Sequence, residues 1–368
     1  MKILYVCGMY VPSHGGAEIS VYTFLKNLQE EKEFEVLVFT DERYENTRDH
    51  PQFNKLKLQL TPHEQREENI ERTILDFKPD VLLTQLMWSD VALKLASKHS
   101  IPSIMRVCKV PLELDLSKES EYAPTKIIST SNAIKDYVRT HWDRDSVIIK
   151  PLINLNDYII GDKEYDPANN NLIFMFNPLE RKGGGLFKEI ARKLPQYNFG
   201  TVKGWSSLKN SKNSRSFSRE YIKRITESEG STFDGGLPNY IDFSDCENVT
   251  LFDPEDDPRR LYEKIRILLI PSQWEEAFGR VAVEAMINGI PVIASDVAGL
   301  KDAVGSGGKL IDKKDINAWV RNVEKLMDDK SYYSELSSSA KEFANENYSE
   351  EEILEKLIIL LNETIKSE

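Results

Sequence analysis

Short apolar runs that alternate with amphipathic stretches dominate the sequence, and the whole pattern occurs twice. Between the runs lie stretches with helical periodicity, such as residues 16–29. Strands that alternate with helices of about 10 to 15 residues predict a parallel, doubly wound sheet. We therefore predict an α/β chain of two doubly wound parallel-sheet lobes. The expected strands are 2–7, 35–39, 80–84, 103–107, 126–131 and 147–149 in the first lobe, and 172–176, 198–202, 249–252, 265–270, 291–294 and 308–311 in the second.

A polar joint near 155–170, rich in Asp, Asn, Gly and Pro, separates the two patterns. A chain of 368 residues is also longer than one hydrophobic core usually serves. We predict a first lobe over residues 1–155 and a second lobe over residues 156–349. Residues 350–368 form a separate amphipathic helix.

Composition excludes several classes of protein. A net charge of −12 disfavours a nucleic-acid binder, because phosphate contacts need clustered Lys and Arg. Three scattered cysteines do not form a disulfide framework or a zinc site, and we expect reduced thiols. The N-terminal apolar run is too short for a signal peptide, and no run is long enough to span a bilayer. These features predict a cytoplasmic protein.

One segment, 206–248, shows no clear strand and is long for a connection between strands. Residues 203–224 hold seven basic side chains against one acidic one, Glu220. Two interpretations remain open. The segment is a solvated helix with an irregular loop, or it is a basic surface for the acceptor or for the inner face of a membrane.

Two carboxylates, Glu276 and Glu284, with seven residues between them, lie between the apolar runs 265–270 and 290–294. This order predicts a buried strand, a loop and then a helix over 280–288. Open α/β sheets bind ligands beyond the carboxyl ends of their strands, and helix N-termini favour phosphate. The two glutamates are therefore placed to accept hydrogen bonds from hydroxyls on either side of a phosphate group.

Four motifs follow one another along nearly the whole chain: Gly15-Gly16-Ala17-Glu18, Lys150-Pro151-Leu152-Ile153-Asn154, Arg181-Lys182-Gly183-Gly184, and the stretch from Glu276 to Glu284. In this order they resemble the GT-B-fold retaining glycosyltransferases of the GT4 family, the glycosyl transferases group 1. The resemblance implies two Rossmann-like lobes facing a cleft. It assigns the acceptor to the first lobe and the nucleotide sugar to the second, with the last helix packed back on the first lobe.

The resemblance also assigns roles to residues of the second lobe. Glu284 would bind the ribose hydroxyls, which suits a carboxylate because it accepts two hydrogen bonds from a vicinal diol. Val281 would share its helix face. Glu276 would contact the donor sugar, although the neighbouring Glu275 competes for that place. The backbone N–H groups of Phe278 and Gly279 would face the sugar or diphosphate. The strand end at Phe252 would lie near the base.

The cations of the site depart in part from the family pattern. Lys182 would neutralise the departing diphosphate, and the arginine usually found a few residues earlier is missing. Arg181 is the substitute, although adjacent residues tend to point apart. Gly15 and Gly16 would let the first loop approach the diphosphate, with His14 beside them. Asp296, which follows the strand 291–294, is expected to cap a helix.

A histidine that the family commonly carries near the donor sugar is absent from the run 101–109. Arg106 or Lys109 could take its place and favour an anionic sugar or acceptor. The alternative is that each is a surface cation at a strand end. The choice of donor sugar is expected to depend on the residue that takes this place.

We expect a hexosyltransferase that moves a sugar from a UDP- or GDP-sugar to an acceptor hydroxyl with retention, in cell-surface glycan or glycoconjugate biosynthesis. The acceptor would be a glycan, a lipid-linked molecule or a small molecule. No cofactor and no metal ion are expected, because the front-face mechanism that the resemblance implies requires no divalent metal. An epimerase of the same fold and a catalytically silent sugar-nucleotide-binding subunit stay open. A dinucleotide-dependent oxidoreductase would need a Gly-x-Gly-x-x-Gly turn after the first strand, and the chain has none there.

Overall fold

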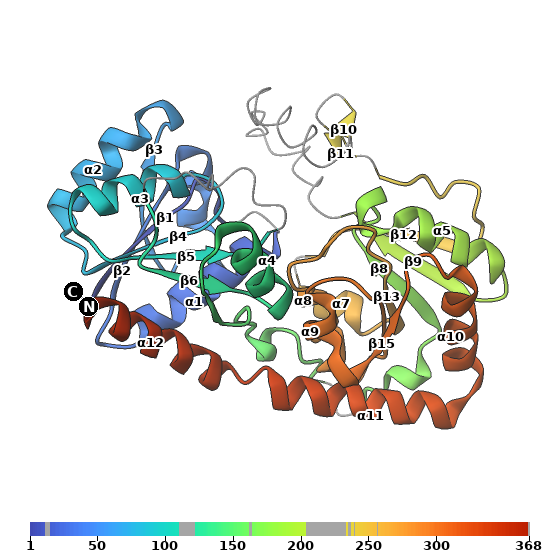
Figure 1. Ribbon diagram of the computed structural model, residues 1–368. Coiled ribbons are helices and arrows are strands. Elements are labelled where there is room, and N and C mark those ends of the chain that lie inside the picture. Colours follow the sequence, from blue (N-terminus) through green and yellow to red (C-terminus); the bar gives the residue numbers. More distant parts are fainter. Residues whose placement is uncertain are drawn as a thin grey trace. The chain divides into compact units, whose positions relative to one another are not determined.

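The structure is a computed structural model that describes residues 1–11, 15–109, 122–161, 164–203, 233–234, 237–238, 240–255 and 257–366. The chain divides into two compact units. The N-terminal unit comprises Met1–Ile153 together with Tyr348–Glu368, and the C-terminal unit comprises Asn154–Asn347. Each unit is an α/β structure with its own parallel sheet (Figure 1).

The sheet of the N-terminal unit has seven parallel strands in the order β3-β2-β1-β4-β5-β6-β7. The chain winds outward from β1 to β3, then returns to β4 beside β1 and winds the other way. The strands are β1 (Lys2–Val6), β2 (Glu35–Asp41), β3 (Lys57–Thr61), β4 (Val81–Thr84), β5 (Ser103–Val107), β6 (Lys126–Ser129) and β7 (Val147–Ile148). The helices are α1 (Gly16–Glu30), α2 (Arg66–Phe77), α3 (Ser89–Lys98), α4 (Asn132–Trp142) and α12 (Glu350–Lys366).

The last helix, α12, belongs to the N-terminal unit although it follows the whole C-terminal unit in sequence. It contacts α1 and β4. Its apolar face is buried, with Leu357 2% exposed and Leu361 fully buried. Among the described residues, no helix combines the length and the apolar character that crossing a lipid bilayer requires.

The sheet of the C-terminal unit has six parallel strands in the order β12-β9-β8-β13-β14-β15. The strands are β8 (Leu172–Phe176), β9 (Asn198–Val202), β12 (Val249–Phe252), β13 (Ile265–Ile270), β14 (Val292–Ser295) and β15 (Lys309–Ile311). The helices are α5 (Gly184–Lys193), α7 (Arg259–Tyr262), α8 (Arg280–Met286), α9 (Leu300–Val304), α10 (Ile316–Asp328) and α11 (Lys330–Asn347). A separate antiparallel pair joins β10 (Phe233–Asp234) to β11 (Leu237–Pro238).

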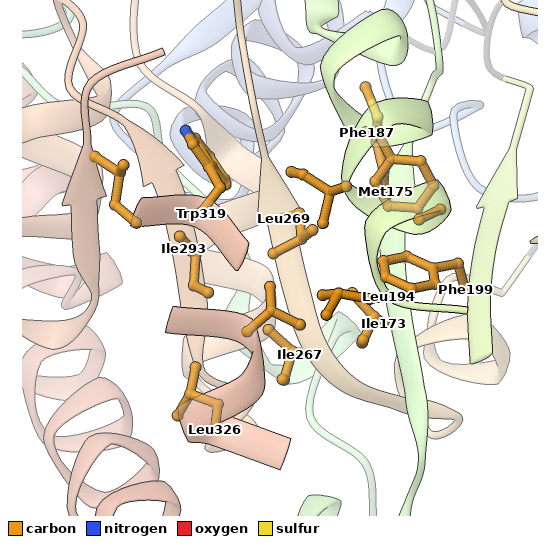
Figure 2. Close-up of a cluster of buried hydrophobic side chains, with 14 of the residues drawn as sticks. Ile173, Met175, Phe187, Leu194, Phe199, Ile267, Leu269, Ile293, Trp319 and Leu326 are labelled. Atoms are coloured by element: carbon orange, nitrogen blue, oxygen red, sulfur yellow. The ribbon is translucent and has the colours of Figure 1, made fainter. Parts of the chain in front are cut away.

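Alternate residues of the C-terminal strands form the main core of that unit (Figure 2). Ile267 and Leu269 of β13 point to the same side of the sheet because side chains alternate along a strand. Phe187 of α5 and Trp319 of α10 cover them and are fully buried. The indole Nε1 of Trp319 donates to the carbonyl of Asp312 at 3.1 Å, so the largest side chain of this core leaves no polar group unsatisfied there.

The two-lobe α/β fold predicted from the sequence is confirmed, and twelve of the parallel strands were expected within two residues of their bounds. The edge strand β3 was missed. Its residues Lys57-Leu58-Gln59-Leu60-Thr61 alternate in polarity and are mostly half-exposed, so they form no continuous apolar run. Helix α8 ends at Met286, two residues earlier than expected. The pair β10–β11 lies in the segment 206–248, for which no strand was expected. Residues 206–232, 235–236 and 239 of that segment lie outside the described residues.

Candidate functional site

The strand order of the C-terminal unit creates a switch point between β8 and β13. From β8 the chain proceeds to β9 and β12 on one side, and from β13 it proceeds to β14 and β15 on the other. The loops that follow β8 and β13 therefore leave the same edge of the sheet in opposite directions. Ligands of open α/β sheets bind in the crevice at such a point.

These two loops are packed directly against each other. The backbone N–H of Gln273 donates to the carbonyl of Arg181 at 2.9 Å. Gly183 has a φ of +89°, and a Cβ at that position would overlap the carbonyl oxygen of Pro271. Only glycine meets both conditions without strain. The Gly183 position thus lets the loop after β8 lie on the loop after β13.

Lys182 and Glu276 form an ion pair between the two loops. The Nζ of Lys182 lies 2.6 Å from Oε1 of Glu276, and the hydroxyl of Ser272 donates to the same oxygen at 2.6 Å. The Lys182 side chain is 26% exposed and that of Glu276 is 10% exposed. Burial alone would raise the pKa of Glu276, but the charge and hydrogen bond of Lys182, with Ser272, hold it below its ordinary value. Glu275 is exposed, so the glutamate that faces Lys182 is Glu276.

Trp274 brings the two neighbouring cations together. The Cζ of Arg181 lies 4.5 Å and the Nζ of Lys182 4.8 Å from the centroid of its ring. The expectation that these adjacent side chains point apart is wrong. They lie in the short 3₁₀ helix Glu180–Lys182, and both reach the same indole. Cation–π attraction therefore helps to hold two positive charges at one place.

Two glycines, Gly279 and Gly299, fix the loop that leads into α8. Gly279 has a φ of +107°, and a Cβ on it would overlap the side chain of Leu300. Gly299 donates from its backbone N–H to the carbonyl of Glu276 at 2.8 Å. A Cβ on Gly299 would overlap the backbone of Ala277. The loop that carries Glu276 therefore packs closely against the start of α9, and Phe278 is buried within the loop.

The expected cap at Asp296 is wrong. Gly299 is the N-cap of α9, and the carboxylate of Asp296 instead forms an exposed ion pair with Lys301 at 3.2 Å. The helix begins three residues later than the sequence suggested, since Ala298 and Gly299 continue the turn first.

Glu284 is a buried carboxylate with donors on both oxygens. The hydroxyl of Tyr262 donates to Oε2 at 2.7 Å, and Nε of Arg280 donates to Oε1 at 3.2 Å. Glu284 is 7% exposed. The amide of Asn288 donates to its backbone carbonyl at 3.0 Å, and Val281 on the same helix is half-buried.

Aromatic rings line the adjoining strand ends. Phe252 packs edge-on against Phe174 with their centroids 5.7 Å apart. Gly200 makes room for this contact, because a Cβ there would lie 2.8 Å from the Phe252 ring. Phe176, at the end of β8, lies 5.2 Å from Tyr262. The rings thus connect the end of β12 with Tyr262, the partner of Glu284.

The N-terminal unit holds the remaining predicted residues. Gly15 is the N-cap of α1 with a φ of −77°, a conformation open to any residue, and Gly16 begins the helix. His14 lies outside the described residues. Lys109 is half-buried at the end of the described stretch.

Arg106 does not lie on the surface, so that interpretation is wrong. It is 6% exposed in the middle of the sheet, and its guanidinium donates to Gln85 at 2.8 Å and to Ser20 at 3.0 Å. Glu18 is buried nearby, and burial raises its pKa to about 7 against the attraction of Arg106.

Among the described residues, no group of three or more His, Cys, Asp or Glu side chains is arranged to hold a metal ion. Beside the loops after β8 and β13, the described residues instead form the pair Lys182–Glu276, with Arg181 beside it, and the pair Arg280–Glu284. Lys182 and Arg181 can bind an anion, and the carboxylates of Glu276 and Glu284 can accept hydrogen bonds from hydroxyls.

Comparisons with known proteins support the fold along the whole chain. The structure is similar to HepE of Anabaena in complex with UDP, with a TM-score of 0.76 and 16% identity. The alignment covers 99% of this chain and all of HepE. It is also similar to WaaG, a glycosyltransferase involved in lipopolysaccharide biosynthesis, with a TM-score of 0.66 and 15% identity. The alignment covers 98% of this chain and 99% of WaaG. With two parallel-sheet units in series, the chain has the GT-B fold, as predicted.

Sequence matches to a family model and to two relatives cover part of the chain. Residues 244–343 match the family model "Glycosyl transferases group 1". The capsular polysaccharide biosynthesis glycosyltransferase CapM of Staphylococcus aureus is 28% identical over 130 residues, 35% of this chain and 34% of that protein. A D-inositol 3-phosphate glycosyltransferase of Mycobacterium sp. (strain KMS) is 39% identical over 85 residues, 22% of this chain and 19% of that protein. The alignments thus span a third or less of these relatives.

Sequence reasoning missed four side chains of the site: Ser272, Trp274, Arg280 and Tyr262. Ser272 and Trp274 stand inside the loop that it had singled out, and a polar or aromatic residue next to Glu276 was a usable signal. The sequence contained no signal for Tyr262, because it precedes Glu284 by 22 residues and lies on another short helix, α7.

Proposed function

We propose that this chain is a retaining glycosyltransferase that moves a sugar from a nucleoside diphosphate sugar to an acceptor hydroxyl. The observation that carries the proposal is the ion pair between Lys182 and Glu276 at the switch point of the C-terminal unit. In this pair, Lys182 is a cation that would bind the diphosphate, and Glu276 is a carboxylate that would accept hydrogen bonds from sugar hydroxyls. The match of residues 244–343 to a glycosyltransferase family model covers Glu276 and Glu284 and supports the same activity.

The roles of the residues follow from their chemistry. Lys182, with Arg181 beside it, stabilises the negative charge that grows on the diphosphate as the bond from the anomeric carbon to its phosphate oxygen breaks. Glu276 accepts hydrogen bonds from sugar hydroxyls, and Glu284 accepts them from the ribose. In a front-face reaction the acceptor oxygen bonds to the anomeric carbon, and a phosphate oxygen of the leaving group takes its proton. These steps need no divalent metal, and we propose a metal-independent enzyme.

The known proteins suggest which substrates to test first. Structures of HepE contain UDP, UDP with glucose, and UDP-glucose, so UDP-glucose is a reasonable first donor. CapM is named for capsular polysaccharide biosynthesis, which supports an acceptor from cell-surface glycan or glycoconjugate synthesis. The proposed membrane contact through residues 203–224 falls almost wholly outside the described residues.

Donor turnover tests the proposal. The full chain is incubated with UDP-, GDP- and ADP-sugars, and the released nucleoside diphosphate is measured with and without EDTA. We expect slow release from one of these donors, unchanged by EDTA and reduced about 10- to 100-fold in Glu276→Gln. Binding of a donor without release would instead indicate a silent binding subunit. Conversion of the donor to another sugar nucleotide without release would indicate an epimerase. Loss in EDTA with recovery on manganese would overturn the metal-independent mechanism.

A further inference from the structure

Glu284 is held by two side chains for which the proposed activity gives no role. Tyr262 donates to one carboxylate oxygen at 2.7 Å, and Arg280 donates to the other at 3.2 Å. Tyr262 is 1% and Arg280 8% exposed. Because each oxygen has its own buried donor, rotation of the carboxylate about its last bond would break both hydrogen bonds. The plane of the carboxylate is therefore fixed before any ligand arrives.

This arrangement leaves the carboxylate able to bind a diol. An ionised carboxylate offers about four acceptor positions, and the two donors occupy two of them. The two that remain match the two hydroxyls of a vicinal diol. Glu284 retains 7% exposure, so its carboxylate is nearly but not wholly enclosed by the protein.

Two aromatic rings and a hydrogen bond to its backbone hold Tyr262 in place. Its ring lies 5.2 Å from that of Phe176 and 6.4 Å from that of Tyr158, both in tilted or edge-on contact. The hydroxyl of Tyr165 donates to its backbone carbonyl at 3.3 Å. Burial and the charge of Glu284 raise the pKa of Tyr262 well above its ordinary value, so its hydroxyl remains a donor.

Arg280 is anchored at a second point. Its Nη2 donates to the hydroxyl of Tyr158 at 3.1 Å. Its charge also offsets the cost of burying the carboxylate of Glu284, since a buried charge is tolerated only with a partner. Both donors to Glu284 are thus rigid, and neither is mobile enough to be displaced easily by a ligand.

We infer that Tyr262 and Arg280 are positioning residues that aim Glu284 at the 2′,3′-diol of the nucleoside, so that the chain selects ribonucleotides over deoxyribonucleotides. The inference rests on the proposed function and goes beyond it, because it names what sets the orientation of Glu284 and which ligands the site rejects. A site built to hydrogen-bond a hydroxyl discriminates strongly against analogues that lack it, because its polar groups are then left unpaired.

Calorimetric titration of the full chain tests the inference. The probes are UDP, GDP and ADP and the 2′-deoxy form of whichever binds most tightly. The wild type should prefer the ribonucleotide by about 10- to 100-fold, as expected for one hydrogen bond to a charged group. In Tyr262→Phe this ratio should fall roughly 3- to 10-fold. Tyr333→Phe is the matched control, because it removes a buried hydroxyl that donates to the backbone carbonyl of Arg266 and not to Glu284, and its ratio should stay at the wild-type value.

A second variant guards against a general loss of structure. Arg280→Lys keeps the positive charge but removes the Nε donor, and it should also lower the ratio while the thermal midpoint stays near that of the wild type. An unchanged ratio in both Tyr262→Phe and Arg280→Lys, with a reduced ratio in Glu284→Gln, would overturn the inference and leave the proposed function standing. Failure of the wild type to bind any of the three nucleoside diphosphates would instead overturn the proposed function.

Discussion

Lys182 and Glu276 lie 94 residues apart in the sequence, yet the Nζ of one is 2.6 Å from Oε1 of the other. The two residues belong to the loops after β8 and β13, the adjacent strands at the switch point of the sheet. Without a ligand, the cation proposed for the diphosphate neutralises the carboxylate proposed for the sugar. A bound diphosphate would compete for Lys182 and thereby free an acceptor on Glu276 for a sugar hydroxyl.

Replacing Lys182 by Ala should reverse the pH dependence that Glu276 contributes to stability. In the wild type the pKa of Glu276 is lowered, so the stability of the pair is present above the ordinary carboxyl range and is lost as the pH falls through the lowered pKa. Without Lys182, burial raises that pKa, so the variant should be more destabilised at about pH 8 than at about pH 5. Because the lysine is partly exposed, we expect a loss of about 1–3 kcal/mol at the higher pH.

Thermal unfolding of the full chain at the two pH values measures this effect. The double variant Lys182→Ala/Glu276→Gln is the control, because it removes the buried charge together with its partner. The double variant should regain most of the stability that Lys182→Ala loses at the higher pH. A single variant with the same deficit at both pH values would contradict the coupling.

The two adjacent glutamates should respond very differently to substitution. Glu276 is buried against Lys182, whereas Glu275 is exposed. Glu276→Gln should lower kcat/KM for donor turnover by about 10- to 100-fold, the effect of one hydrogen bond to a charged group. Glu275→Gln should leave it within about 2-fold. Equal losses in both variants would argue against the contact that we assign to Glu276.

Gly183→Ala should disrupt the packing of the two loops. A Cβ at this position would overlap the Pro271 carbonyl, and the φ of +89° disfavours any side chain. We expect a loss of stability of about 2–4 kcal/mol and weaker nucleotide binding. Gly161→Ala is the matched control, because a Cβ there meets no atom within 4 Å. Thermal unfolding and nucleotide titration of both variants measure the difference, and a stable Gly183→Ala protein would contradict the loop geometry.

Glu18 should make the N-terminal unit less stable as the pH rises. Burial raises its pKa from 4.5 to about 7, so the folded chain binds a proton that the unfolded chain releases between those values. Stability should therefore decrease across this range by roughly 3 kcal/mol and stay reduced above it. Glu18→Gln should remove the decrease and exceed the wild type in stability at about pH 8, measured by urea unfolding. Parallel pH profiles for the two proteins would show that Glu18 is charged in the folded state.

The C-terminal helix supplies a test of the N-terminal core. Leu361 of α12 is fully buried, whereas Ile359 on the same helix is 49% exposed. Leu361→Ala should cost about 2–4 kcal/mol, and Ile359→Ala should stay within about 1 kcal/mol. Urea unfolding followed by circular dichroism separates the two. Similar small losses would mean that α12 contributes little to the stability of the N-terminal unit.

Which parts of the fold were predictable depended on burial. The central strands β8 and β13 are almost continuous apolar runs, because the central strands of a parallel sheet are covered on both faces. The edge strand β3 alternates in polarity and escaped notice. In the same way, the glutamates of the site were visible as a motif, whereas Tyr262 could be recognised only once its hydroxyl was found on Glu284.

The sequence by itself determined the doubly wound architecture and the loop that carries Glu276, because local apolar periodicity and glycine positions report on elements one at a time. Only the tertiary structure decided which glutamate faces Lys182, that Arg181 and Lys182 share the Trp274 ring, and that Arg106 is buried on Gln85 and Ser20. The physical reason is that each of these contacts joins loops or strands distant in sequence, and their geometry is set by how the sheet brings strand ends together.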